Sequence, residues 1–83
     1  MSRQINHRDL VLSDPKRPKF HFLRLPFDLQ DDIISLLDKN LLTFHGASEM
    51  AKKRGHFLSY MGISRYYVAV RKARRSILIM NAS

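Results

Sequence analysis

Apolar residues recur at helical intervals in two parts of the chain, and the first part begins after Pro26. Its apolar positions fall on one face of a helix: Leu29, Ile33, Leu36, Leu37 and Leu41. Asp28 can serve as the N-cap, and Asp31 and Asp32 would lie in the first turn, where negative charge is favourable. The pattern predicts a helix over 28–41.

The second amphipathic stretch lies near the C-terminus. Its apolar positions share one arc of a helical wheel: Ile63, Tyr66, Ala69, Val70, Ala73, Ile77 and Met80. The rest of the wheel is mostly cationic: Arg65, Arg71, Lys72, Arg74 and Arg75, with Tyr67 and Val68 among them. We expect a helix over 63–76, or over 63–80, that buries one side and turns its cations outward.

Two shorter helices are predicted between these stretches. The first covers 46–54 and ends at Gly55, because glycine accepts the left-handed conformation that follows many helices. The second covers 56–61, with Phe57, Leu58 and Met61 as its apolar contacts, and it stops at Gly62. The chain is therefore predicted to be all-α, with about four helices.

Residues 1–24 are predicted to form an extended basic arm, and residues 25–83 the folded domain. Pro15 and Pro18 restrict the backbone of this arm, because each proline limits both itself and the residue before it. Three of its cations are close together: Lys16, Arg17 and Lys19. We expect the first dozen residues to be poorly ordered without a partner.

Composition narrows the possible classes of protein. The chain has 83 residues, of which 45% are hydrophobic, and it has no cysteine. That length allows one small domain, and the lack of cysteine excludes disulfides and zinc–thiolate sites. The apolar run at 77–80 is far too short for a membrane span. We expect a soluble, cytoplasmic protein.

Positive charge is concentrated in the second half of the chain. The sequence has 15 Lys and Arg against 7 Asp and Glu, a net charge of +8. Residues 1–45 have a net charge of +1, and residues 46–83 have +7. Such clustering favours a polyanionic partner, with nucleic acid as the leading class and association with the nucleoid as the expected location. A basic face that serves only solubility is the alternative.

One local pattern resembles the helix-turn-helix motif of DNA-binding proteins. The family has a small or apolar residue, then Gly-Ile-Ser, then a β-branched residue: here these positions are Leu58, Gly62, Ile63, Ser64 and Val68. The resemblance implies a turn at Gly62, a recognition helix capped by Ser64, and insertion of that helix into the major groove. The wider layout is also similar to the DNA-binding region of small terminase-type proteins from Mu-like phages.

The sequence departs from this family in two ways. Leu58 is larger than the usual residue, and Arg71 stands where an apolar residue is preferred. The motif places Val68 in the core, whereas the helical wheel places Tyr66 and Val70 there. A second pairing also stays open, in which 46–54 is the first helix and 55–62 an enlarged turn. The Leu-Pro-x-Asp-Leu opening at 25–29 is similar to an F-box, but residues 42–60 lack the further hydrophobic landmarks of that family.

The predicted DNA-binding residues have different roles. Ser64, Arg65, Tyr67, Val68, Arg71 and Lys72 would line the exposed side of the last helix, with Arg65 and Arg71 as candidates for base edges. Arg74 and Arg75 would meet phosphates, as would Lys52, Lys53 and Arg54 on the flanking backbone. Lys16, Arg17 and Lys19 would enter a neighbouring minor groove.

The expected function is sequence-specific binding of double-stranded DNA by a small transcriptional regulator, such as a repressor of phage, plasmid or bacterial type. The apolar residues 77–80 favour a homodimer on a palindromic site. We expect no enzyme activity and no cofactor, because the sequence has no Gly-rich phosphate loop and no nucleophile motif. We expect no metal, because His7, His21, His45 and His56 each lack a second ligand at helical spacing. RNA binding and a protein-interaction module, such as an inhibitor or packaging adaptor that docks on an acidic surface, are the alternatives.

Overall fold

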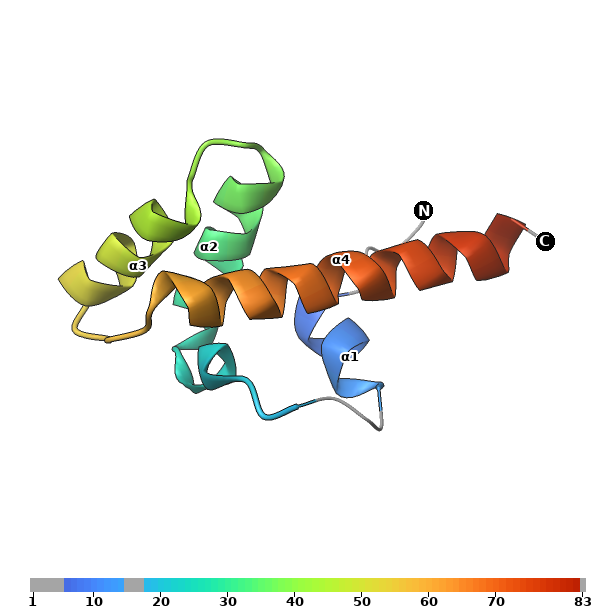
Figure 1. Ribbon diagram of the computed structural model, residues 1–83, viewed down its shortest axis with the longest axis horizontal. Helices are drawn as coiled ribbons and strands as arrows, with labels where there is room; N and C mark the ends of the chain where they lie inside the picture. Colours follow the sequence, from blue (N-terminus) through green and yellow to red (C-terminus); the bar gives the residue numbers. More distant parts are fainter. Residues whose placement is uncertain (1–5, 15–17, 83) are drawn as a thin grey trace.

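Five helical segments make up the fold seen in the computed structural model, which describes residues 6–14 and 18–82 (Figure 1). In chain order they are α1 (His7–Leu12), the 3₁₀ helix η1 (His21–Arg24), α2 (Phe27–Asp38), α3 (Phe44–Lys53) and α4 (Tyr60–Ala82). The described residues contain no strand. The prediction of a small all-α fold is therefore confirmed.

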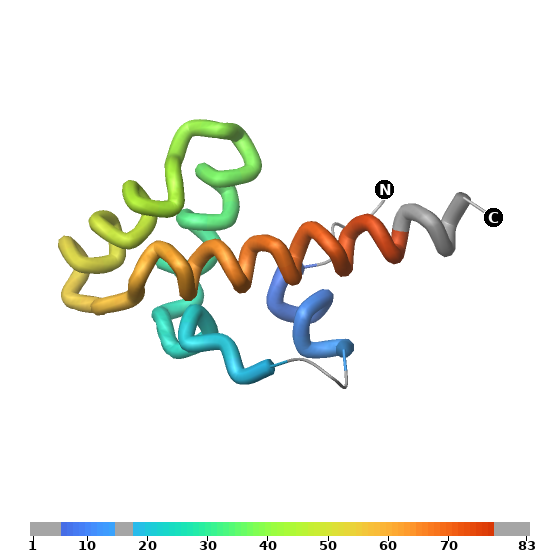
Figure 2. The backbone as a smooth tube through the Cα atoms, in the orientation of Figure 1, coloured from blue at the N-terminus to red at the C-terminus, as the bar shows by residue number. Residues whose placement is uncertain are grey.

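α4 is the axis on which the other elements pack (Figure 2). α3 lies beside the first turns of α4, where the rings of His45 and Tyr60 stack 4.1 Å apart. α1 lies further along α4, against Tyr66 and Ala69. One side of α4 is thus covered by α1, η1, α2 and α3.

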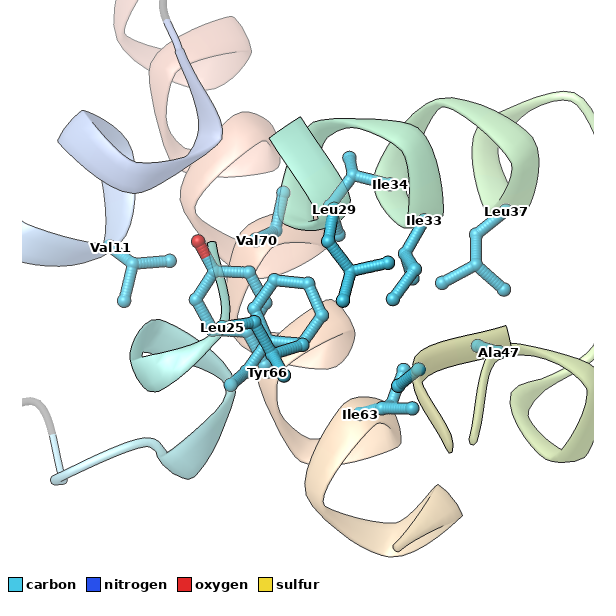
Figure 3. Close-up of a cluster of buried hydrophobic side chains, with 12 residues drawn as sticks. Val11, Leu25, Leu29, Ile33, Ile34, Leu37, Ala47, Ile63, Tyr66 and Val70 are labelled. Carbon is cyan, nitrogen blue, oxygen red and sulfur yellow. The ribbon is translucent and has the colours of Figure 1, made fainter. Parts of the chain in front are cut away.

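The core lies between α4 and the elements packed against it, and α2 contributes the most buried apolar side chains (Figure 3). Ile63, Tyr66 and Val70 of α4 are completely buried, and the Tyr66 ring stacks on Phe22 of η1 with 4.2 Å between centroids. These are the positions that the helical wheel predicts. Val68 is 43% exposed, so the competing register that puts Val68 in the core is wrong.

The ends of α2 and α3 differ slightly from the prediction. α2 begins at Phe27, with Pro26 rather than Asp28 at the N-cap, and ends at Asp38 rather than 41. It ends there because Asn40 takes a left-handed φ of 57°, which leaves Leu41 69% exposed. α3 begins at Phe44 and ends before Gly55, whose φ of 84° agrees with the predicted helix stop.

α4 begins earlier than predicted and continues through Gly62. Residues 56–59 are not helical, so the predicted helix over 56–61 and the turn at Gly62 are both wrong. The Oγ of Ser59 accepts a hydrogen bond from the Gly62 amide (3.3 Å), so Ser59 caps α4 and Ser64 lies inside the helix. A Cβ at Gly62 would lie 2.9 Å from the Leu58 side chain, so glycine here gives Leu58 room to pack.

Because α4 starts at Tyr60, only one of the two helix pairings that the sequence permits is present. α3 is the first helix, α4 is the second, and residues 54–59 connect them. The connection is shorter than the enlarged turn over 55–62 that this alternative assumes. α3 and α4 pack directly against each other, with the Phe44 and Tyr67 rings 6.0 Å apart.

The N-terminal segment is not the extended arm that the prolines predict. Residues 7–12 form α1, residues 21–24 form η1, and His7, Leu10 and Val11 are buried against the rest of the fold. The side chain of Asn6 caps α1 by accepting a hydrogen bond from the Arg8 amide (2.8 Å). The predicted boundary between arm and domain at residue 24 therefore runs through a single hydrophobic core, which includes Val11 and Phe22.

Candidate nucleic-acid interface

The face of α4 that lies opposite the core is solvent-exposed over residues 61–75. Its members are three or four residues apart, which places them on one side of the helix: Met61, Arg65, Val68, Lys72 and Arg75. We call this set the outward face. All five are exposed, in contrast to Ile63, Tyr66 and Val70 on the opposite side.

The outward face has an uncompensated positive charge. α4 contains five cationic residues and no Asp or Glu. Three of these cations belong to the outward face, and in the described part of the chain none of the three forms an ion pair with a carboxylate. A helix with positive charge on one uncovered side attracts anions, and a regular polyanion most strongly.

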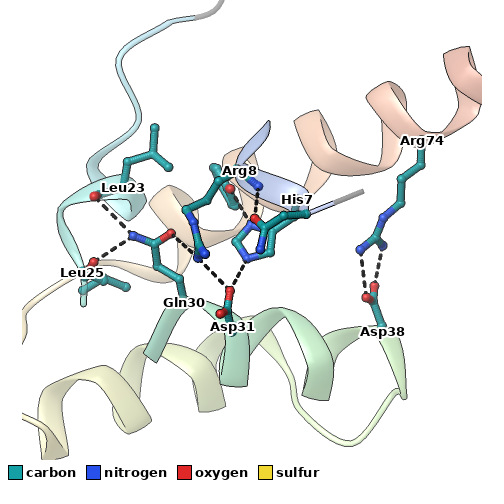
Figure 4. A network of polar contacts seen from close by, with 10 residues as sticks. His7, Arg8, Leu23, Leu25, Gln30, Asp31, Asp38 and Arg74 are labelled. Carbon is teal, nitrogen blue, oxygen red and sulfur yellow. Dashed lines mark hydrogen bonds and ion pairs between the residues drawn. The ribbon is translucent and has the colours of Figure 1, made fainter. Parts of the chain in front are cut away.

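Arg74 and Tyr67 lie on another side of α4, facing α2. The Arg74 guanidinium donates two hydrogen bonds to the Asp38 carboxylate, at 2.8 and 3.1 Å (Figure 4). The Tyr67 hydroxyl donates a third, at 2.7 Å. Partial burial raises the pKa of Asp38, but these hydrogen bonds outweigh it and hold the pKa below its ordinary value. Arg74 and Tyr67 therefore join α4 to α2. They are not placed to contact nucleic acid, although the sequence predicts that they do.

Ser64 and Arg71 lie at the edge of the outward face nearest α3. Ser64 is half-buried inside the helix. Arg71 is exposed and borders an open hollow of about 540 Å³ together with Phe44 and Tyr67. Arg71 can therefore reach an anion beside the outward face, whereas Ser64 has little access to one.

The cations predicted to flank the interface divide into three groups. Lys52 and Lys53 are exposed in the last turn of α3 and have no ion pair with a described carboxylate. Arg54 is bound to Asp32 of α2 through a 3.1 Å contact. Lys19 is exposed before η1, whereas residues 16 and 17 lie outside the described residues.

A partly buried polar cluster holds α1 against α4 and α2 (Figure 4). The Nδ1 of His7 lies 2.6 Å from the Tyr66 hydroxyl, and its Nε2 lies 2.9 Å from a carboxylate oxygen of Asp31. Arg8 contacts the same oxygen at 2.7 Å. Gln30 of α2, fully buried, donates to the carbonyls of Leu23 and Leu25. These contacts connect four elements: α1, η1, α2 and α4.

Burial and charge determine the protonation of this cluster. Burial lowers the pKa of His7 below its ordinary 6.5, although the hydrogen bond to Asp31 opposes the shift. A neutral imidazole fits the contacts, because Nε2–H can donate to Asp31 while Nδ1 accepts the Tyr66 hydroxyl proton. Burial also raises the pKa of Tyr66. Since Tyr66 is inaccessible, this tyrosine–histidine–carboxylate series is suited to positioning α1 and α4 rather than to reacting with a substrate.

The described residues contain no group of three His, Asp or Glu side chains that could hold a metal ion. Within the same residues, no helix combines the length and apolar character needed to cross a bilayer.

The sequence interpretation missed two exposed apolar residues, one just before α4 and one in its first turn. Phe57 and Met61 are predicted as core contacts, but they are 84% and 51% exposed. The error follows from the break assumed at Gly62. Once α4 runs through that glycine, Met61 lies two turns before Val68 on the same side, and this spacing is visible in the sequence.

Comparison with known proteins adds no relative: no family model matches the chain, and no curated protein or solved structure matches it.

Proposed function

We propose that the protein binds double-stranded DNA sequence-specifically, with α3 and α4 as a helix-turn-helix pair and α4 as the recognition helix. The observation that carries this proposal is the outward face: an uncovered side of a 23-residue helix with Arg65, Lys72 and Arg75 exposed. An α-helix with its side chains is about 10–12 Å across. The major groove is about 12 Å wide and admits such a helix.

The position of each cation suggests its role. Arg65 lies near the start of α4, the part of a recognition helix that reaches base edges, and a guanidinium can bond a guanine through two hydrogen bonds. Lys72, Arg75 and Arg71 lie further along and are suited to phosphates. Lys52 and Lys53 at the end of α3 would contact the backbone beside the groove. The role of Arg74, Arg54 and Tyr67 is instead to contact the carboxylates of α2 and stabilise the fold.

The biological role that fits this interface is a small transcriptional regulator. A homodimer would place two copies of α4 in successive major grooves, with half-sites about 34 Å apart. The apolar run at 77–80 remains the predicted contact between copies. Sedimentation of the protein alone and with duplex tests that part separately.

The decisive experiment is selection of bound sequences from a random 20-base-pair duplex library. We expect one sequence to be enriched. The double variant Arg65→Ala/Arg75→Ala should bind that duplex at least tenfold more weakly, because one lost base contact alone costs about 1–3 kcal/mol. Arg24→Ala/Lys39→Ala removes the same charge from exposed residues outside α4 and is the matched control, with a much smaller loss.

Where duplex binding is seen, two outcomes would overturn the proposal. One is equal loss of affinity in both double variants, since the binding would then reflect net charge and not the outward face. The other is preference for duplex RNA of the same sequence over DNA. Absence of duplex binding at 50 mM salt, together with capture of an acidic protein, would favour the interaction-module alternative.

A further inference from the structure

The outward face combines apolar and cationic side chains in alternation. Met61 is 51% exposed and Val68 is 43% exposed, although both belong to a folded helix with a buried opposite side. Arg65 lies between them, and Lys72 and Arg75 follow. Single exposed apolar residues are ordinary on protein surfaces. Here two exposed apolar residues lie on one helical face, and cations precede and follow Val68. The surface can therefore make both apolar contacts and contacts with anions.

Charge complementarity identifies the occupant of this surface. A second copy of the chain would bring like charges together at Arg65, Lys72 and Arg75, which costs free energy. A bilayer would have to accept Arg65 between the two apolar side chains, away from the charged flanks usual in interfacial helices. The major groove offers both matching chemistries, because purine edges and phosphates accept hydrogen bonds while thymine presents a methyl group.

We propose that Met61 and Val68 read the C5-methyl groups of two thymines in the major groove, on either side of the base that Arg65 contacts. This inference rests on the proposed function and specifies the chemistry of the site that α4 recognises. The seven-residue separation of Met61 and Val68 corresponds to a rise of about 10 Å along the helix. That length matches about three base-pair steps of 3.4 Å. The recognised sequence therefore contains two thymines at roughly this spacing.

The test uses the duplex enriched by selection, with each thymine replaced in turn by uracil. Uracil keeps the base pair and lacks only the C5-methyl group. For the native protein we expect affinity to fall about fourfold at each of two positions, the effect of losing the burial of one methyl group. Replacement at the other positions should change affinity less than twofold.

Variants assign each methyl group to a side chain. Met61→Ala should bind more weakly to the thymine duplex and become insensitive to uracil at one position, and Val68→Ala at the other. Leu41→Ala is the matched control, because Leu41 is an apolar residue with 69% exposure in the loop between α2 and α3. It should keep the full sensitivity at both positions.

The outcomes separate this inference from the proposed function. If the native protein binds its selected duplex and no uracil replacement weakens binding, thymine readout is wrong and DNA binding stands. If Met61→Ala and Val68→Ala lose affinity but keep the full sensitivity to uracil, these side chains do not read the methyl groups. If no duplex is enriched, the proposed function itself fails.

Discussion

The side of α4 that packs on the fold and its outward face differ in what their side chains contact. Arg74 faces α2, where Asp38 accepts two hydrogen bonds from it, whereas Arg75, one residue later, points into solvent without a described carboxylate partner. Tyr66 is buried and hydrogen-bonded to His7, whereas Val68 is exposed. The residues of α4 that stabilise the fold are therefore those that α1 and α2 bury or bind. What those elements leave uncovered is the outward face.

The largest contrast between the two sides should appear in stability. Ile63→Ala removes a completely buried side chain and should lower the free energy of unfolding by about 2–5 kcal/mol. Val68→Ala on the outward face should change it by less than about 0.5 kcal/mol. Urea denaturation followed by circular dichroism measures both. Equal losses would mean that the outward face is packed against something in the free protein.

A change of pH should have an intermediate effect on stability. This effect should come from His7, on the buried side of α4. The pKa of His7 lies below its ordinary 6.5, so the fold favours the neutral imidazole. Stability should therefore be fully present above pH 6.5 and fall as the pH drops from there towards the lower folded-state pKa. The charged groups around His7 are Arg8, Asp31 and Arg74. Asp31 has a lowered pKa of its own, from the hydrogen bonds of His7 and Arg8 against an opposing burial effect, and adds a second loss only below about pH 4.

Thermal denaturation between pH 5 and pH 8 tests the role of His7. The variant His7→Gln cannot gain a proton in this range, so its melting temperature should lose the dependence on pH that the native protein shows between pH 5 and pH 6.5. The selected duplex should bind equally well across the range wherever the protein stays folded, since the outward face has no histidine. A pH step that persists in His7→Gln would assign it to another group.

The smallest effect should come from the ion pair between Arg74 of α4 and Asp38 of α2. Asp38→Asn removes the carboxylate that holds Arg74 and should lower the free energy of unfolding by less than about 1 kcal/mol, because both partners are partly exposed. Freeing Arg74 should also strengthen duplex binding and steepen its dependence on salt. Asp28→Asn is the control: Asp28 is exposed on the same helix and does not contact Arg74. The same gain in affinity from both variants would mean that only net charge matters.

Local sequence patterns predict α2, α3 and the buried face of α4 well, and for one physical reason. Apolar spacing reports which side of a helix leaves water, so Ile63, Tyr66 and Val70 can be identified before any coordinates. Helix boundaries are less predictable. Gly62 suggests a break because glycine is a poor helix former, but its cost of about 1 kcal/mol is small enough for the Ser59 cap and the packing of Ile63 to offset.

The candidate site is predicted only in part. Arg65, Lys72 and Arg75 are on the exposed side as expected, but Tyr67, Arg74 and Arg54 are occupied by contacts with α2. No spacing rule within α4 reveals a carboxylate that arrives from another helix. The same holds for α1: His7 is an isolated histidine in the sequence, and its partners lie 24 and 59 positions away.

The sequence by itself determined that the chain is helical, that α4 has an apolar side, and that positive charge gathers in the second half. These properties follow from spacing and composition, which are local. Only the tertiary structure decided which cations are neutralised by α2, that α1 belongs to the core, and that Met61 is exposed. Ion pairing and burial depend on residues distant in the chain, and only the folded arrangement brings those residues together.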